Sequence, residues 1–239
     1  MQTSIQTIYI IPSLIAEQSK DKSITPELVS IIKKLPAFLV ENKKTARRFI
    51  AQLQLDIYFD SLHWYELTKD TSAQEVKAMF DEIQKLGLSD IGLLSDAGCP
   101  GIADPGSLAI QYAHQHNIKV VPLVGPSSIL LALMASGLNG QSFVFHGYIP
   151  IPEDQRSRYI KSMEKDSIQN ARTQIFIETP YRNHSVLKTI LATCHPRTKL
   201  CIASNMTASD EYIRTSSIAE WIRNPIDLSK KPTVFLIGQ

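Results

Sequence analysis

The residues best suited to chemistry lie in one loop, at residues 95–106. It reads Ser-Asp-Ala-Gly-Cys-Pro-Gly-Ile-Ala-Asp-Pro-Gly. Its glycines let the backbone turn sharply and approach a ligand, and Asp96 and Asp104 supply carboxylates that could accept a proton. Asp104 followed by Pro105 is also an ordinary way to begin a helix. The residues alone therefore leave two alternatives, a ligand loop and a helix start.

A second loop, at residues 125–128, reads Gly-Pro-Ser-Ser. At the start of a helix, Ser127 and Ser128 could hold a polar or anionic group beside free backbone N–H groups, or could simply cap the helix. The sequence has no G-x-G-x-x-G after its first apolar run and no G-x-x-x-x-G-K-[ST]. Ordinary dinucleotide-binding and P-loop interpretations therefore lose their main support.

The elements that must position these loops follow a strand–helix alternation in the first half of the chain. It predicts an α/β domain with a mostly parallel sheet and helices on both faces. Thr25 can cap a helix that starts at Pro26, and Ser72 with Glu75 has the spacing of a capping box. The expected strands are 7–11, 37–40, 91–94 and 118–123, and the expected helices are 26–35, 43–54, 73–86 and 105–115.

The second half has a different pattern. Expected strands at 142–145, 174–177, 199–204 and 233–237 are separated by fewer regular helices, which predicts a mixed sheet. Residues 149–158 contain two prolines and several charges, and we expect them to form an exposed connection. We place the domains at 1–122 and 123–239. Ligands of open α/β sheets bind beyond the carboxyl ends of the strands, which is where both loops lie.

The composition limits the classes of function. Hydrophobic residues make up 44% of the chain and the net charge is +2, so any nucleic-acid contact must come from a local basic patch. The three cysteines form no C-x-x-C, and His114 and His116 point to different faces of a helix, so we expect no metal site. No secretory signal and no run of about 18 apolar residues is present. We therefore expect a cytoplasmic protein without a membrane partner.

Several motifs together resemble one family. They are Ser-Asp-Ala-Gly-Cys-Pro at 95–100, Asp-Pro-Gly at 104–106, Val-Pro-Leu-Val-Gly-Pro at 121–126, Ser-Gly-Leu at 136–138 and Gly-Tyr-Ile-Pro at 147–150. The sequence resembles the tetrapyrrole methylase superfamily, most closely its bacterial 16S rRNA cytidine 2′-O-ribose methyltransferases. Glu-Thr-Pro-Tyr-Arg at 178–182 and the apolar run at 232–238 continue the resemblance, which covers residues 8–238. Without the extra C-terminal segment of longer rRNA enzymes, the sequence resembles a short form.

The resemblance implies two α/β domains, S-adenosylmethionine as methyl donor in a cleft between them, and a homodimer. It implies rRNA or the small ribosomal subunit as partner. A tetrapyrrole or other small-molecule methylase, a donor-binding regulatory module without catalysis, and an α/β phosphate-binding enzyme remain alternatives. By position, the implied donor-binding residues are Leu14, Gly98, Cys99, Ile102, Ser127, Ser128, Ile177, Asn205, Met206 and Thr233. The family's glycine turn after the first strand is absent, because residues 11–17 contain no glycine.

Methyl transfer from a sulfonium needs positioning more than a strong base. If the acceptor is a hydroxyl, a carboxylate could accept its proton, and the candidates are Glu178, Asp96 and Asp104, in that order. The alternative for Glu178 is an ion pair with Arg182 four residues on. Glu41, Lys44, Arg47 and Arg182 are candidates for substrate binding. Lys44 and Arg47 share a helix face that could hold RNA phosphates or be only solvated surface.

Overall fold

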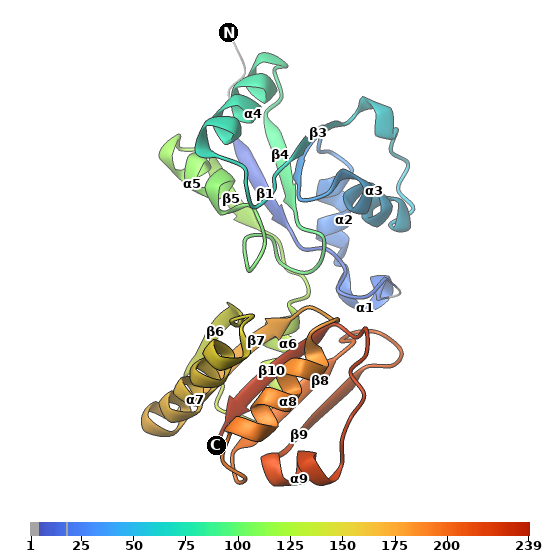
Figure 1. Cartoon of the computed structure of the whole chain (residues 1–239). Coiled ribbons are helices and arrows are strands. Elements are labelled where there is room, and N and C mark those ends of the chain that lie inside the picture. The colour runs from blue at the N-terminus through green and yellow to red at the C-terminus, as the bar shows by residue number, and fades with distance from the viewer. Residues whose placement is uncertain (1–4, 18) are drawn as a thin grey trace. The chain divides into compact units, whose positions relative to one another are not determined.

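The computed structural model describes residues 5–17 and 19–239. The chain divides into two compact units, Met1–Ser127 (unit 1) and Ser128–Gln239 (unit 2). Figure 1 draws unit 1 in blue to green and unit 2 in green to red. Each unit contains one five-stranded sheet with helices on both of its faces. No helix in the described ranges is long and apolar enough to cross a membrane.

Unit 1 is built on a wholly parallel sheet, which confirms the mostly parallel sheet predicted for the first half of the chain. Its strands are β1 (Thr7–Ile11), β2 (Ala37–Val40), β3 (His63–Glu66), β4 (Asp90–Leu94) and β5 (Lys119–Pro122), in the order β3-β2-β4-β1-β5. Because all strands run the same way, their carboxyl ends meet at one edge. The sequence pattern did not predict β3, whose side chains are only partly buried.

The helices of unit 1 cover the sheet in two layers. They are α1 (Lys20–Ser23), α2 (Pro26–Ile32), α3 (Lys43–Gln52), α4 (Ala73–Lys85) and α5 (Ser107–Gln115), with a short 3₁₀ helix η1 (Phe59–Ser61). Successive strand residues point to opposite faces, so Leu39 packs in the core of α4 and α5 while Phe38 packs in the core of α2 and α3.

Both predicted helix caps of unit 1 are confirmed. The Thr25 hydroxyl accepts a hydrogen bond from the Leu28 N–H at 3.2 Å. Ser72 and Glu75 form the reciprocal capping box. The helix expected from residue 105 instead begins at Ser107, because Gly106, with a φ of 132°, occupies the N-cap position. Asp104 therefore does not cap α5.

Unit 2 contains the mixed sheet that the sequence predicts. Its strands are β6 (Phe143–Tyr148), β7 (Thr173–Glu178), β8 (Lys199–Ser204), β9 (Tyr212–Ser217) and β10 (Thr233–Gly238), in the order β6-β7-β10-β8-β9. β6 and β7 are parallel, and the other pairs are antiparallel. The carboxyl ends of β6, β7 and β8 thus lie at the same end of the sheet as the start of β10.

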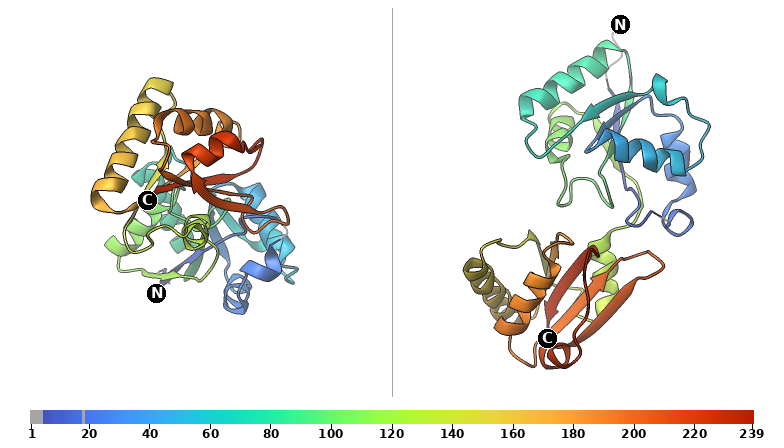
Figure 2. Two further views of the ribbon diagram at one scale, coloured as in Figure 1. Left: turned by 90° about the horizontal axis from the view of Figure 1, so that it is seen from below. Right: turned by 45° about the vertical axis from the view of Figure 1, so that its right-hand side comes forward.

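The helices of unit 2 are more regular than the sequence analysis expected. They are α6 (Ser128–Ser136), α7 (Glu153–Asn170), α8 (Asn183–Thr193) and α9 (Ile218–Arg223). Helices α7 and α8 pack on one face of the sheet and α6 on the other (Figures 1 and 2). The connection expected at 149–158 is confirmed only as far as residue 152, because α7 begins at Glu153. Pro152 is the N-cap residue of α7, where a proline does not interrupt a helix, and Arg156 within it is buried.

Candidate active site

The carboxyl edge of the unit 1 sheet is held together by the residues that follow β1, β2 and β4. Ser13 and Gly98 form an antiparallel bridge, with N–H to oxygen distances of 2.9 and 3.3 Å. The Ser13 hydroxyl also donates to the Ser95 carbonyl at 3.0 Å. Glu41, directly after β2, accepts a hydrogen bond from the Asp96 N–H at 3.1 Å. The loop at 95–106 is therefore tied to the ends of β1 and β2, the two strands that flank β4.

The loop after β5 contacts the same edge. The Cys99 thiol donates to the Pro126 carbonyl at 3.4 Å. Gly125 lies against Pro12, because a Cβ placed on Gly125 would be 2.4 Å from the Pro12 Cβ. The turn after β1, although it has no glycine, thus lies close to the backbone of both loops, at Gly98 and at Gly125. The glycines that allow this contact belong to the partner loops: Gly125 leaves room for Pro12, and Gly98 has a φ of 70°.

Three predicted site residues, Glu41, Asp96 and Asp104, bring negative charge to this edge. Burial raises the pKa of Asp104 to about 7, with the charges of Glu41 and Asp96 adding to the effect. The pKa of Asp96 is also raised, first by burial and then by Glu41, while a hydrogen bond from Thr45 and the charge of Arg48 oppose the shift. Burial and Asp104 raise the pKa of the Cys99 thiol. A carboxyl that titrates near neutral pH is suited to accept a proton.

Two cavities lie beside these carboxylates. Asp104 lines a cavity of about 330 Å³ together with Thr68, Lys69 and Thr71 of the β3–α4 loop. Asp96 and Leu14 line a smaller one, of about 140 Å³, with Thr45 and Arg48 of α3. The sequence analysis missed Ser13, Thr45 and the β3–α4 loop. Among these only Ser13 gave a signal, since it lies two residues after the end of β1.

The unit 2 candidates gather at the end of its sheet where β10 begins. Thr233 pairs with Glu178 on one side and with Ser204 on the other. Ile177 precedes Glu178 on β7, and Asn205 and Met206 follow β8, with the Asn205 N–H donating to the Pro232 carbonyl at 2.9 Å. The structure thus brings Ile177, Glu178, Asn205, Met206 and Thr233 together. Ser128 is the first residue of α6, which packs against β10.

Glu178 makes the ion pair that the i,i+4 spacing allows. Its Oε2 lies 3.0 Å from Nη2 of Arg182, and its Oε1 accepts the Thr179 N–H at 2.7 Å. The side chain of Glu178 is fully buried. Oε1 is hydrogen-bonded, and Oε2 is ion-paired although it accepts no hydrogen bond. The ion pair favours the structural interpretation of this residue over that of a free base.

Unmet hydrogen-bonding capacity and strained backbone mark the same end of unit 2. At this end the buried atoms without a hydrogen-bond partner among the described residues are Ser204 Oγ, Thr207 Oγ1, Asn183 Oδ1 and Glu178 Oε2, the last of which is ion-paired with Arg182. Asn205 and Thr207 have φ angles of 48° and 68°, which is unusual for a β-branched residue such as threonine. Orphaned polar groups and strain of this kind are typical of ligand sites. They fit a ligand with hydroxyl, amino and carboxyl groups, such as S-adenosylmethionine.

The remaining predicted residues lie on surfaces. Ile102 is 48% exposed on the loop that follows β4. Lys44 and Arg47 lie on α3 and line an open hollow of about 530 Å³ with Glu66. Arg47 is 3.8 Å from Asp60 and stacks over the Phe59 ring at 5.4 Å. Ser127 is the last residue of unit 1.

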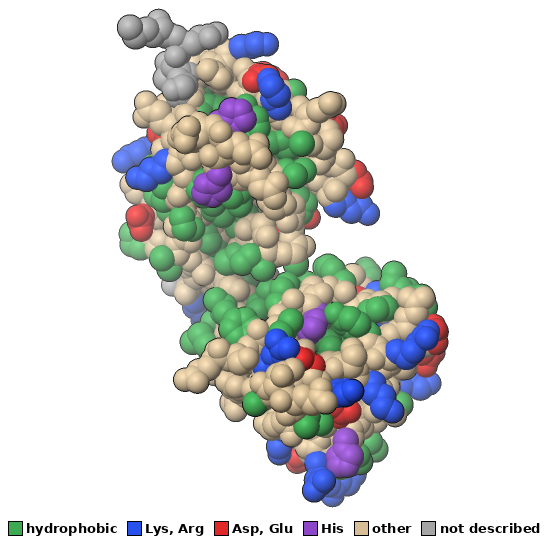
Figure 3. Space-filling model, turned by 90° about the vertical axis from the view of Figure 1, so that its left-hand side faces the viewer, with side chains coloured by type: hydrophobic (Ala, Val, Ile, Leu, Met, Phe, Trp, Pro, Cys, Tyr) green, Lys and Arg blue, Asp and Glu red, His purple; other side chains and the backbone are tan. Residues whose placement is uncertain are grey.

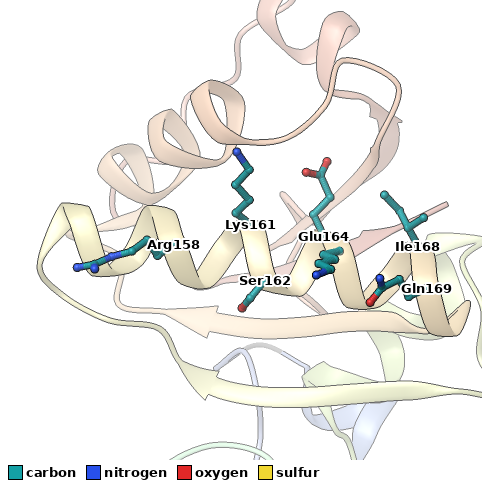
Figure 4. A pocket seen from close by; sticks show the side chains of 7 residues that line it. Arg158, Lys161, Ser162, Glu164, Ile168 and Gln169 are labelled. Carbon is teal, nitrogen blue, oxygen red and sulfur yellow. The ribbon is translucent and has the colours of Figure 1, made fainter.

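Another hollow, of about 590 Å³, runs along α7 and contains none of the predicted residues (Figure 4). Two of its charged residues have local partners. Arg158 is paired with Asp154 at 2.6 Å, and the Glu164 carboxylate accepts hydrogen bonds from the His195 N–H and the Thr198 hydroxyl. We therefore assign this hollow no part in the site.

Comparison with known proteins identifies the family. Residues 20–221 match the model for tetrapyrrole (corrin/porphyrin) methylases. The chain belongs to this family. The ribosomal RNA small subunit methyltransferase I of Vibrio cholerae serotype O1 is 30% identical over 96% of this chain and 76% of its own length. The same-named protein of Escherichia coli O157:H7 is 25% identical over 96% and 77%.

Solved structures of tetrapyrrole methylases share the fold. The methyltransferase CobJ matches with a TM-score of 0.62 at 16% identity, covering 99% of this chain and 94% of CobJ. Uroporphyrin III C-methyl transferase from Thermus thermophilus matches with a TM-score of 0.60 at 13% identity, covering 98% and 97%. Family membership confirms the predicted class, a methyltransferase that uses S-adenosylmethionine as its methyl donor.

The contact between Gly125 and Pro12 yields a first prediction. Gly125→Ala should lower the free energy of unfolding of unit 1 by about 1–3 kcal/mol, because the new methyl group overlaps a rigid proline ring. Gly140→Ala is the matched control, since a Cβ there meets nothing within 4 Å. Urea unfolding followed by circular dichroism measures both. Equal transition midpoints for the two variants would show that the contact is not tight.

Proposed function

We propose that this chain transfers a methyl group from S-adenosylmethionine to RNA of the small ribosomal subunit, at the 2′-hydroxyl of a cytidine ribose. The observation that carries the proposal is the 30% identity, over 96% of the chain, to a protein named for methylation of that RNA. The proposal also places the chain in the cytoplasm, where such a substrate is found. A tetrapyrrole substrate is the second candidate, favoured by the family description and the structural relatives.

Two groups of residues support donor binding. In unit 1 they are Leu14, Gly98 and Cys99, at the sheet edge that Ser13 holds together. In unit 2 they are Ile177, Asn205, Met206 and Thr233, beside the orphaned hydroxyls of Ser204 and Thr207. Ile102, Ser127 and Ser128 complete the proposed set from their places on loops and at the start of α6. When bound, S-adenosylmethionine supplies an electrophilic methyl group on a sulfonium, a good leaving group.

Asp104 is the best-placed proton acceptor in this proposal. With a pKa of about 7 it is ionised in a large share of molecules at neutral pH, yet basic enough to take up a proton as the acceptor oxygen bonds to the methyl carbon. Asp96 and Glu41 lie beside it and disfavour additional negative charge. Glu178 is ion-paired with Arg182, so we assign Glu178 to holding the β7 end in place rather than to proton transfer.

The test is transfer of radiolabelled methyl groups to small ribosomal subunits, free rRNA and tetrapyrroles. We expect label in small subunits, with kcat rising as pH increases toward about 7, because only ionised Asp104 can accept the proton. Asp104→Asn should lower kcat by about 100-fold or more and abolish this rise. Glu178→Gln should keep the pH profile of the wild-type protein.

Other outcomes decide between the candidates. Label in tetrapyrroles alone would replace the RNA proposal with the small-molecule one. Binding of S-adenosylmethionine without transfer to any acceptor would favour a regulatory module. An unchanged pH profile in Asp104→Asn would remove Asp104 from the mechanism and return the role to Asp96 or Glu178.

We propose further that Glu41, Lys44, Arg47 and Arg182 contact the substrate, with Lys44 and Arg47 holding RNA phosphates. Both basic residues line the open hollow beside α3. Reversing both charges, as Lys44→Glu with Arg47→Glu, should weaken RNA binding at least tenfold and reduce the slope of log affinity against log salt by about 2. Filter binding at several salt concentrations measures this. The same reversal at Lys161 and Lys165 on α7 is the control, and equal effects would mean that the α3 patch is not specific.

A homodimer is the oligomeric state that we propose. The outward face of α6 supports it, since Leu130 is 51% and Met134 is 79% exposed on a helix that is apolar on all sides. Such a helix is normally covered. Sedimentation of the purified chain as a single molecule would exclude the dimer.

A further inference from the structure

Three large apolar side chains are exposed beside the unit 2 site. Tyr148 at the end of β6 is 57% exposed, Ile151 is 71% exposed, and Tyr181 after β7 is 89% exposed. Tyr148 is paired in register with Ile177, one of the proposed donor-binding residues. Figure 3 views the molecule from the side on which β6 lies in Figure 1 and shows hydrophobic side chains exposed on unit 2. Single exposed apolar residues are common, but a cluster at a functional end of a sheet indicates recognition.

The backbone beneath this cluster is rigidly held. Arg182 donates to the Pro150 carbonyl at 3.3 Å. Arg156, which is 5% exposed, donates to the Ile151 carbonyl at 2.8 Å and to the Thr189 hydroxyl at 3.0 Å. Ile149, which lies between the exposed Tyr148 and Ile151 in the sequence, packs in the core of unit 2. Two guanidinium groups thus fix the consecutive carbonyls of Pro150 and Ile151. Because this backbone is already held in place, little conformational entropy would be lost when a ligand binds to it.

The charge around the cluster indicates what it can bind. The guanidinium of Arg182 is balanced by Glu178, whose side chain is fully buried. The exposed part is therefore aromatic and aliphatic rather than strongly basic. Flat, uncharged rings fit such a surface, and unpaired nucleobases stack on exposed aromatic side chains. A duplex would present its phosphates instead and keep its bases stacked inside.

We propose that Tyr148 and Tyr181 form a stacking platform for an unpaired base of the RNA substrate, next to the methyl acceptor. The platform rests on the proposed function, because it assumes an RNA substrate at this site. It makes single-stranded or looped RNA, rather than a perfect duplex, the form that the protein recognises. The two tyrosines act on substrate choice and affinity, and take no part in the chemical step.

The probe is a short single-stranded oligoribonucleotide carrying 2-aminopurine, whose fluorescence falls when its base stacks. Wild-type protein should quench it on binding. Tyr181→Ala and Tyr148→Ala should each weaken binding by about 5- to 100-fold and lose the quenching, whereas Tyr181→Phe should retain both. Ile222→Ala, which removes a side chain 56% exposed on α9, is the matched control. The alanine variants should raise KM for small subunits and leave KM for S-adenosylmethionine unchanged.

Three results would overturn the platform. The first is that wild-type protein and both alanine variants bind single-stranded RNA equally. The second is that affinity falls equally for the duplex form of the same RNA, or that Ile222→Ala weakens binding as much as the tyrosine variants do. Alanine variants that become monomers while RNA binding is unchanged would show that the surface joins two copies of the chain. If wild-type protein quenches the probe through the tyrosines but methylates no small subunits, the platform stands and the proposed function fails.

Discussion

The backbone bridge between Ser13 and Gly98 is the interaction on which the unit 1 site depends. Loops after parallel strands have no sheet neighbour of their own, and the segment between β4 and α5 would otherwise be free to move. The bridge, with the Ser13 hydroxyl on the Ser95 carbonyl, joins this loop to the end of β1. Cys99 and Asp104 take their positions from that attachment.

The same attachment explains why the carboxylates of unit 1 differ from Glu178. Glu41 accepts the Asp96 N–H and so is fixed where its charge acts on both aspartates. Asp104 is partly buried, and its burial together with the charges of Glu41 and Asp96 moves its pKa toward neutrality. Glu178 is buried more deeply, but a guanidinium and a backbone N–H meet its two oxygens. Environment gives similar side chains different roles.

Much of the fold was predictable from local pattern, and the failures have physical causes. Short, mostly apolar runs predicted β1, β2 and β8 to the residue, and side-chain oxygens at Thr25 and Ser72 marked helix starts. β3 and β9 escaped because their half-exposed side chains alternate weakly. The prolines near residue 150 were interpreted as a loop, although one of them precedes the first turn of α7.

The sequence could predict the location of the candidate site only to the extent that it predicts where the strands end. The rule that ligands bind beyond carboxyl ends pointed to residues 95–106, but the bridge that shapes the loop joins residues 82 positions apart or more, and no local pattern encodes it. The conformation of Gly106 decided whether Asp104 caps α5 or faces the cavity beside Lys69. That choice depends on tertiary packing around the loop.

Thr233 shows how tertiary contacts limit what a predicted binding residue can do. Its hydroxyl donates to the Lys231 carbonyl at 2.8 Å and accepts from the buried Asn183 amide at 3.2 Å. Asn183 in turn donates to the Lys231 carbonyl at 2.6 Å, so the chain entering β10 is fixed by a side chain from α8. The hydroxyl proton of Thr233 is used in the hydrogen bond to the Lys231 carbonyl, so the hydroxyl cannot donate to a ligand. Polar recognition at this end must therefore come from backbone groups and from the hydroxyls of Ser204 and Thr207, which have no hydrogen-bond partner.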